Sequence, residues 1–256
     1  MIAIGIIPAR MASTRFPGKP MAKINNIPMI GHCYFRTRMA LELSKTYVAT
    51  CDLEIADYIN SIGGDVVMTD SSHTRATTRT AQALEKIEAE IGDKIDIVLM
   101  VQGDEPLITP DLINEAISNF KDSEVDIVNI MSPIKTHEQF IDKNNVKVVF
   151  NKINNALYFS REPIPSTWLG ADRHPMFMQT GIIAFRRDTL LSFNRLEETL
   201  LEKIESIDMN RVLETGGCIR MLLTNNLMIG VDTCQDLVEA EKYLLNDPLI
   251  AAYQIA

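Results

Sequence analysis

Short apolar runs alternate with segments of helical spacing along the first half of the chain. The runs are continuous rather than alternating apolar and polar, which is typical of strands buried on both faces of a sheet. A β-α-β-α succession of this kind predicts a mostly parallel sheet flanked by helices. We expect strands at residues 2–7, 46–50, 65–68, 95–101 and 126–131, and helices at 28–43, from a cap at Asp52 to 61, at 77–91 and at 110–120.

The second half of the chain is less regular. We expect strands at residues 146–150, 155–160, 181–185 and 219–224, and helices at 201–213 and 233–245. Residues 162–178 form a long turn-rich segment, and a loop of that length in a compact domain is usually functional or part of an interface. Because no repeat or flexible linker interrupts the chain, we predict one α/β domain over residues 1–256, with an inserted lobe near 132–186.

Composition and charge exclude several classes of protein. The net charge of −9 over 256 residues argues against a nucleic-acid binder, which needs a basic face. The cysteines at 33, 51, 218 and 234 lack metal-site spacing and are predicted to be reduced thiols of a cytoplasmic protein. The apolar run at residues 2–7 is too short for a signal peptide, and no stretch is long enough to span a membrane.

A basic loop follows the first predicted strand. Arg10, Arg15 and Lys19 stand within ten residues, beside Ser13 and Gly18. Ligands of open α/β sheets bind at the carboxyl ends of the strands, and a triphosphate needs several charged donors and a close backbone. The loop is neither a GxGxxG nor a Walker A sequence. Taken alone, it is equally compatible with a solvated basic loop.

Two acidic segments suggest a metal site. Asp104 follows the buried strand at residues 95–101, where a carboxylate can hold Mg²⁺ against phosphates. Asp232 precedes the helix expected at 233–245. Each has a simpler interpretation, since the sequence at residues 103–106 also suits a turn and Asp232 suits a helix cap. Together with the basic loop, they favour phosphoryl-group chemistry.

These segments resemble a known family, the 3-deoxy-manno-octulosonate (Kdo) cytidylyltransferases. The family pattern IPAR-x-x-S-x-R-x-PGKP is present in full at residues 7–20. Further matching motifs are PMI-x-H (28–32), VAT-x-D (48–52), GG-x-VVMT (63–69), VQGDEP (101–106), VKVV (146–149), ALYFSR (156–161), IP (164–165) and GVDT-x-x-DL (230–237). The resemblance extends from residue 2 to about residue 245.

The resemblance implies a Rossmann-like nucleotide-diphospho-sugar transferase fold with a dimerising lobe, and hence a homodimer. It implies transfer of CMP from CTP to a 2-keto sugar acid with release of pyrophosphate, Mg²⁺ as cofactor, and a role in lipopolysaccharide or capsule biosynthesis. By matching position, the metal ligands are Asp104 and Asp232, which with Lys19 and Arg10 form the catalytic set. The nucleotide-binding residues are Pro8, Ala9, Arg10, Ser13, Arg15, Lys19, His73, Thr77, Arg79, Gln102 and Asp104.

The acceptor half departs from the family pattern. The residues matched to the sugar acid are Arg161, Gln179, Glu205, Asp208 and Met209, and Arg161 is the expected carboxylate anchor. At position 179 the family has histidine, and at 208–209 it has Glu-Gln. Residues 73–79 also differ, because Arg75 is an added cation and Ala76 and Thr78 replace glycine and aspartate. We therefore expect Kdo or a related acid as the acceptor.

Two other functions are compatible with part of these features. A sugar-1-phosphate nucleotidyltransferase would share the fold, but the glycine-rich GGxGTRL segment of those enzymes is absent. A catalytically inactive nucleotide-binding homologue would explain the departures, although retention of both aspartates and Lys19 opposes it. Trp168 is expected to pack in the lobe or at a subunit contact, and His137 and His174 to lie at the surface.

Overall fold

The computed structural model describes residues 1–13, 16–168, 170 and 174–253. Its strands are β1 (Ala3–Pro8), β2 (Lys23–Ile24), β3 (Ile27–Pro28), β4 (Lys45–Thr50), β5 (Asp65–Met68), β6 (Ile97–Val101), β7 (Ile127–Pro133), β8 (Lys147–Phe150), β9 (Ala156–Ser160), β10 (Phe177–Arg186) and β11 (Arg220–Leu223). Its α-helices are α1 (Met29–Arg38), α2 (Leu53–Ser61), α3 (Ala76–Ile91), α4 (Pro110–Ser118), α5 (His137–Ile141), α6 (Arg187–Arg195), α7 (Leu200–Glu205), α8 (Met209–Glu214) and α9 (Cys234–Leu244).

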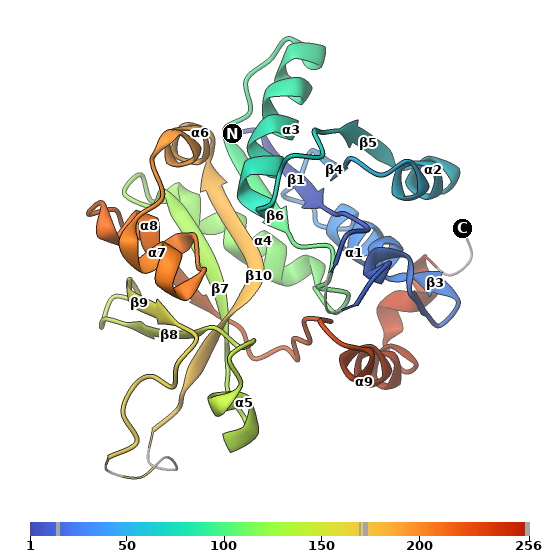
Figure 1. The fold of residues 1–256 in the computed structure, drawn as a ribbon. Coiled ribbons are helices and arrows are strands. Elements are labelled where there is room, and N and C mark those ends of the chain that lie inside the picture. Colours follow the sequence, from blue (N-terminus) through green and yellow to red (C-terminus); the bar gives the residue numbers. More distant parts are fainter. Residues whose placement is uncertain (14–15, 169, 171–173, 254–256) are drawn as a thin grey trace.

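One mixed sheet forms the centre of the molecule (Figure 1). Its main strand order is β11-β7-β10-β6-β1-β4-β5. The pairs β6–β1, β1–β4, β4–β5 and β7–β11 are parallel, as predicted, whereas β10 runs antiparallel to both neighbours. The β8–β9 hairpin joins this sheet through β10, where Lys147 pairs with Met178.

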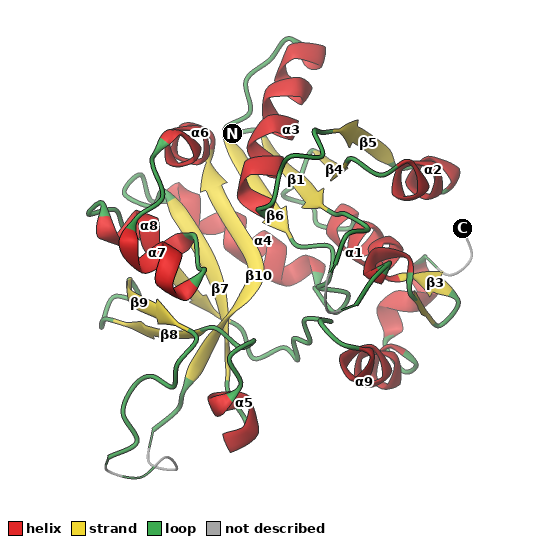
Figure 2. Ribbon diagram, viewed as in Figure 1, coloured by secondary structure: helices red, strands yellow, loops and turns green. Residues whose placement is uncertain are grey.

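Helices cover both faces of the sheet (Figure 2). Successive residues of each buried strand point to opposite faces, so β6 contributes Leu99 to one core and Met100 to the other. One core packs the sheet against α1, α2, α4 and α9, and the other packs it against α3, α6 and α8. This three-layer arrangement leaves the loops at the carboxyl ends of β1 and β6 free to form a site.

Four expectations about the elements need correction. The helix expected at 28–43 ends at Arg38, and a short β2–β3 hairpin precedes it. The helix expected at 201–213 is two helices, since Ser206 adopts a left-handed conformation with φ of 54°. The strand expected at 181–185 begins at Phe177, and the strand at 95–101 begins at Ile97. The pattern did not predict α5 and α6.

The second half of β10 lies in the main sheet between β6 and β7, although the predicted lobe contains all of β10. The boundaries of that lobe stay a prediction. Trp168 is 90% exposed, so it does not pack in the lobe, and the alternative of a subunit contact stays a prediction. His137 and His174 are exposed, as expected. Among the described residues, no helix has the length and apolar character needed to cross a bilayer.

Candidate active site

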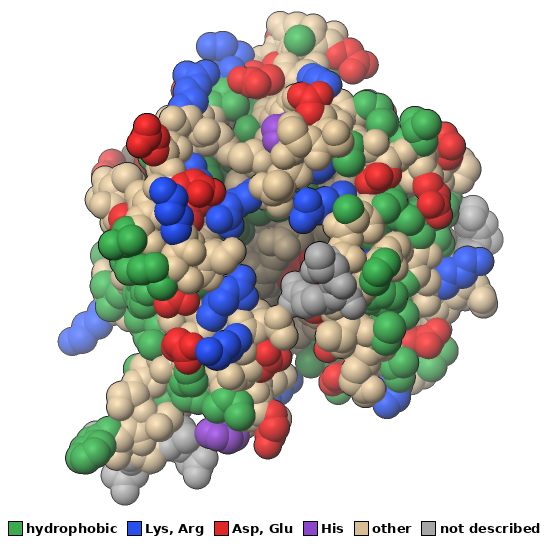
Figure 3. Space-filling model, in the orientation of Figure 1, with side chains coloured by type: hydrophobic (Ala, Val, Ile, Leu, Met, Phe, Trp, Pro, Cys, Tyr) green, Lys and Arg blue, Asp and Glu red, His purple; other side chains and the backbone are tan. Residues whose placement is uncertain are grey.

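A cavity of about 490 Å³ opens at the carboxyl edge of the sheet. Its wall comes from the loops after β1 and β6, the start of α3, the first half of β10 and the segments around residues 206 and 230. Lysine and arginine side chains gather around the hollow in Figure 3. The predicted site residues that line it are Pro8, Ala9, Arg10, Ser13, Lys19, His73, Arg79, Gln102, Asp104, Arg161, Gln179, Asp208 and Asp232. Arg15 lies outside the described residues.

Hydrogen bonds to backbone groups of the basic loop hold it in place. Asp52 accepts a hydrogen bond from the backbone nitrogen of Met11 at 2.8 Å. Asp52 occupies the N-cap position of α2, as predicted, but its carboxylate forms no capping bond to that helix. Gly18 adopts a φ of 71°, and its nitrogen donates to the Met11 carbonyl at 3.2 Å. These contacts close the loop and direct Lys19 toward the end of β6.

Lys19 joins the two predicted metal ligands. Its ammonium lies 2.7 Å from Oδ2 of Asp104 and 3.1 Å from Oδ1 of Asp232. Burial alone would lower the pKa of Lys19, but the charges and hydrogen bonds of the two carboxylates outweigh it and raise the pKa. Thr233 and Asp236 form the capping box of α9, so the alternative interpretation of Asp232 as that cap is wrong.

The donor set at this point suits a hard divalent cation. Carboxylate oxygens from two loops lie within hydrogen-bond distance of one ammonium position. The described part of the chain has no cluster of three or more His, Cys, Asp or Glu side chains able to hold a metal. Mg²⁺ is commonly held by one or two carboxylates together with substrate phosphates. The two aspartates therefore fit Mg²⁺ that is bound with a triphosphate.

Glu105 is a site residue that the sequence analysis treated only as part of a turn. Its Oε1 accepts a hydrogen bond of 2.6 Å from the nitrogen of Gly181, and its Oε2 is buried without a partner among the described residues. Burial, reinforced by the charge of Asp104, raises the pKa of Glu105 to about 8. A Cβ at Gly181 would lie 3.0 Å from this carboxylate. The loop after β6 is thereby tied to β10.

The loop at residues 73–79 is organised by Arg79. The buried guanidinium donates to the Thr69 hydroxyl and to the carbonyls of Asp70, at 3.4 Å, and His73, at 3.3 Å. Thr77 does not line the cavity, because its hydroxyl donates to Oδ2 of Asp208 at 2.8 Å. Its position gives no support to the predicted contact with the nucleotide.

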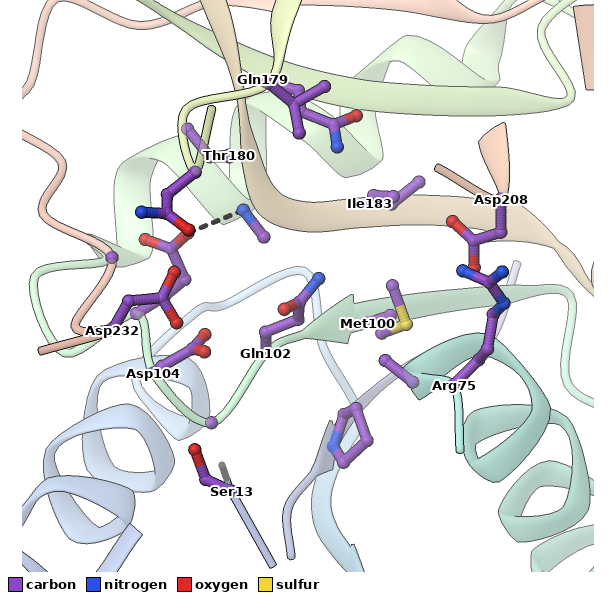
Figure 4. Close-up of a pocket in the computed structure, with 18 of the residues that line it drawn as sticks. Ser13, Arg75, Met100, Gln102, Asp104, Gln179, Thr180, Ile183, Asp208 and Asp232 are labelled. Atoms are coloured by element: carbon purple, nitrogen blue, oxygen red, sulfur yellow. Dashed lines mark hydrogen bonds between the residues drawn. The ribbon is translucent and has the colours of Figure 1, made fainter. Parts of the chain in front are cut away.

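Arg75 and Asp208 face each other at the end of the cavity remote from Asp104 and Asp232 (Figure 4). Removal from water raises the pKa of Asp208, and the bond from Thr77 and the charge of Arg75 oppose that rise. Arg75 also lies 3.8 Å from Glu202. The departures at 73–79 and at 208–209 are thus neighbours in space.

Arg161 lines the cavity beside the segment that leads to Asp208. Its Nε donates to the Glu205 carbonyl at 2.7 Å, and its Nη1 donates to the Lys143 carbonyl at 2.9 Å. The carboxylate of Glu205 does not line the cavity, since it accepts bonds from Tyr158, Ser160 and the Arg161 nitrogen. Glu205 therefore supports Arg161 and does not face a ligand.

Two further side chains near the expected acceptor site are fully buried. Met209 is fully buried in the core on the α3, α6 and α8 side, so the expectation that it faces the acceptor is not supported. Lys147, which the sequence analysis missed, is also fully buried. Its ammonium donates to the carbonyls of Asp142, Asn145 and Arg161. Burial lowers the pKa of Lys147. The sequence gives no signal that a lysine inside an apolar strand will bind three backbone carbonyls.

Unpartnered polar atoms concentrate at this cavity. Among the described residues, eight buried side-chain oxygen or nitrogen atoms lack a hydrogen-bond partner. Three of them, in His73, Glu105 and Ser132, belong to residues of the cavity wall. A fourth is in Asn129, which is bonded to Gln179 of that wall. Because buried polar groups are normally satisfied, this concentration indicates a site built for a polar ligand.

Comparisons with known proteins agree with this geometry. A family model described as cytidylyltransferase matches residues 4–223. A 3-deoxy-manno-octulosonate cytidylyltransferase from Syntrophotalea carbinolica is 37% identical over 253 residues, which cover 95% of this chain and 99% of the relative. A protein of the same description from Geobacter metallireducens is 42% identical over 243 residues, covering 91% of this chain and 93% of the relative.

Solved structures show the same fold. A CMP:2-keto-3-deoxy-manno-octonic acid synthetase complexed with CTP superposes with a TM-score of 0.86 at 32% identity, covering 96% of this chain and 99% of that one. A putative glucose-1-phosphate thymidylyltransferase from Bacillus anthracis has a TM-score of 0.68 at 16% identity, with 96% of each chain covered. The second likeness concerns the fold alone.

Proposed function

This chain belongs to the 3-deoxy-manno-octulosonate cytidylyltransferase family, and we propose that it transfers CMP from CTP to the anomeric hydroxyl of Kdo or a Kdo-like acid. The observation that carries the proposal is the convergence of Lys19, Asp104 and Asp232 at the wall of a polar cavity. In the reaction, the anomeric oxygen forms a bond to the α-phosphorus of CTP and loses its proton. The bond from that phosphorus to the β-phosphate oxygen breaks, and pyrophosphate leaves.

The nucleotide half of the cavity contains the donors for the triphosphate. The loop from Pro8 to Lys19 supplies backbone groups and the charges of Arg10 and Lys19, to which the resemblance adds Arg15. We infer that Asp104 and Asp232 hold Mg²⁺, because their oxygens converge on one cationic position. When bound, the ion neutralises phosphate charge as the transition state develops. Lys19 then stabilises the leaving phosphates as a fixed cation.

The acceptor half contains a candidate anchor for a carboxylate. Arg161 lines the cavity, and its Nε, Nη1 and Nη2 donate to the carbonyls of Glu205, Lys143 and Ser206, which leaves one N–H on each terminal nitrogen. A planar guanidinium suits a carboxylate because it can donate two parallel hydrogen bonds. Asp208 and Arg75 at the far end can bind acceptor hydroxyls. This arrangement supports a sugar acid rather than a neutral sugar as the acceptor.

The proposal also covers the oligomeric state and the cellular location of the enzyme. We propose a cytoplasmic homodimer that acts on small molecules, without a nucleic-acid or membrane partner. The net charge of −9 supports this for nucleic acid. The sugar nucleotide would serve lipopolysaccharide or capsule biosynthesis, as the resemblance implies.

The proposal is tested by measuring pyrophosphate release with each nucleoside triphosphate against a panel of 2-keto sugar acids. Turnover is expected with CTP and at least one acid, and Asp104→Asn should abolish it while an exposed variant such as Glu54→Gln leaves it unchanged. Release with sugar 1-phosphates and with no acid would favour a sugar-1-phosphate nucleotidyltransferase instead. Binding of CTP and Mg²⁺ without release on any acceptor would indicate an inactive homologue.

A further inference from the structure

Asn129 is a polar residue in an otherwise apolar setting. It is fully buried on β7, in register with Ile183 of β10, and its neighbours on the same face of the strand are the buried Ile127 and Met131. Its Nδ2 donates a hydrogen bond of 3.1 Å to Oε1 of Gln179, and its Oδ1 has no partner among the described residues. A half-satisfied amide in a core destabilises the fold relative to an apolar residue of similar size. Such a residue requires an explanation other than packing.

The hydrogen bond fixes which end of the Gln179 amide can reach a ligand. Because Oε1 is engaged by Asn129, the Nε2 group with its two N–H donors is the end available to the cavity. Gln179 lies in the cavity wall near Ile183 in Figure 4. A ligand atom beside it must therefore accept a hydrogen bond.

Ser132 is a second polar residue of β7, and it lines the cavity. It is 4% exposed, and its hydroxyl has no partner among the described residues. The pairing of β7 with β10 places Ser132 opposite Met178 and places Met131 opposite Gln179. Paired residues share a face and successive residues alternate, so Ser132 and Gln179 point to opposite faces of the sheet. The Ser132 hydroxyl is also buried, so of these two groups only the Gln179 amide is placed to meet a ligand.

We propose that the Gln179 amide nitrogen forms a neutral subsite that selects the acceptor by a hydrogen-bond-accepting oxygen, and that Asn129 is the positioning residue that orients the amide. This inference rests on the proposed function and assigns part of its acceptor specificity. It explains why a destabilising buried asparagine is present. It also gives the glutamine at position 179 a role that needs no positive charge.

The test compares KM for the acid with KM for CTP in three variants, using pyrophosphate release with the acid that the wild type turns over best. Asn129→Leu frees the amide to rotate, Ser132→Ala removes the hydroxyl, and Gln179→Glu keeps the acceptor for Asn129 but replaces the donor with a carboxylate. Asn129→Leu and Gln179→Glu should each raise KM for the acid about tenfold or more, with KM for CTP within about twofold of wild type. Ser132→Ala, on the other face of the same strand, should change neither value. Gln179→Glu should show the largest rise, because its carboxylate also repels an anionic acceptor.

Stability separates a positioning role from a structural one. Thr37→Val is the matched control, since Thr37 carries a buried, unpartnered hydroxyl outside the cavity wall. Both Asn129→Leu and Thr37→Val should leave the melting temperature unchanged or higher, and only the former should change KM for the acid. An unchanged KM for the acid in Asn129→Leu and Gln179→Glu would overturn the inference, as would a parallel rise in both KM values. A wild type that turns over no acid would overturn the proposed function and this inference with it.

Discussion

The ammonium nitrogen of Lys19 lies 2.7 Å from Oδ2 of Asp104, although 85 residues separate the two in the sequence. The same nitrogen reaches Asp232 at 3.1 Å. Lys19 thus acts as an internal counter-ion for two carboxylates that would otherwise repel each other. A divalent cation bound by these carboxylates must compete with the ammonium, whereas a triphosphate attracts the ammonium away from them.

Replacement of Lys19 should therefore strengthen the binding of a free metal ion. We expect Lys19→Met to bind Mn²⁺ about tenfold or more tightly in the absence of nucleotide, because the ammonium no longer competes with the metal ion for the two carboxylates. Turnover should fall by about 10²–10³-fold, since a fixed cation at the phosphates is lost. Electron paramagnetic resonance titration of free Mn²⁺ measures the first effect. Lys45→Met, which removes an exposed lysine paired with Asp65, is the control and should change neither quantity. Equal or weaker Mn²⁺ binding by Lys19→Met would refute the competition.

Met209 provides a test of the acceptor site through a residue that faces away from it. Met209→Gln restores the family residue, but it buries an amide in the core between the sheet and α8. We expect a loss of about 1–3 kcal/mol in the free energy of unfolding and no gain in turnover of Kdo. Urea denaturation and the pyrophosphate assay measure the two effects. A rise in kcat/KM for Kdo with no loss of stability would place this side chain at the ligand.

The elements that could be predicted are those with a local signal. Continuous apolar runs identified the buried strands, and the basic loop and Asp104 could be placed at the carboxyl edge of the sheet because each follows a predicted strand. The insertion of β10 between β6 and β7 has no local signal, since strand pairing depends on residues far apart in the sequence. The break at Ser206 was missed because a left-handed serine is not marked by glycine or proline.

The acceptor residues were harder to predict for a related reason. Asp208 and Met209 are consecutive in the sequence, but successive residues at a helix start point in different directions, so Asp208 lines the cavity and Met209 lies in the core. Glu205 matches a family position, yet its carboxylate binds the Arg161 nitrogen and does not line the cavity. Asn129 and Ser132 lie in an apolar strand, and only the structure shows that their polar atoms lie at or near the cavity wall.

Glu205 should affect the acceptor through Arg161. Its carboxylate accepts bonds from Tyr158 at 2.9 Å, Ser160 at 2.8 Å and the Arg161 nitrogen at 2.8 Å. Glu205→Gln replaces one acceptor oxygen with a donor, so at least one of these bonds is lost. We expect KM for the acid to rise about tenfold and KM for CTP to stay unchanged. Glu162→Gln, an exposed glutamate paired with Lys143, removes the same charge nearby and should have no such effect. A rise in both KM values for Glu205→Gln would contradict its assigned role.

Glu88 links α3 to the start of α6 by accepting two hydrogen bonds from the guanidinium of Arg187. The Nε and Nη2 atoms of Arg187 lie 2.7 and 2.8 Å from the two carboxylate oxygens, and the Ile95 nitrogen donates to the same carboxylate at 2.9 Å. The bonds from Arg187, opposed by burial and assisted by Ile95, lower the pKa of Glu88. The ionised form therefore stabilises the fold above the unfolded pKa of about 4.3, and this contribution is lost as the pH falls through the lower folded pKa.

Glu88→Gln should consequently destabilise the protein in a pH-dependent manner. At pH 7 we expect a loss of about 1–3 kcal/mol in the free energy of unfolding, because a charged, mostly buried pair is broken. The difference from wild type should shrink as the pH is lowered through and below about 4, where the wild-type carboxyl also becomes neutral. Thermal unfolding across this pH range measures the trend. Glu90→Gln, an exposed glutamate on the same helix, should match wild type throughout. A difference between Glu88→Gln and wild type that stays constant with pH would show that the ion pair contributes no stability.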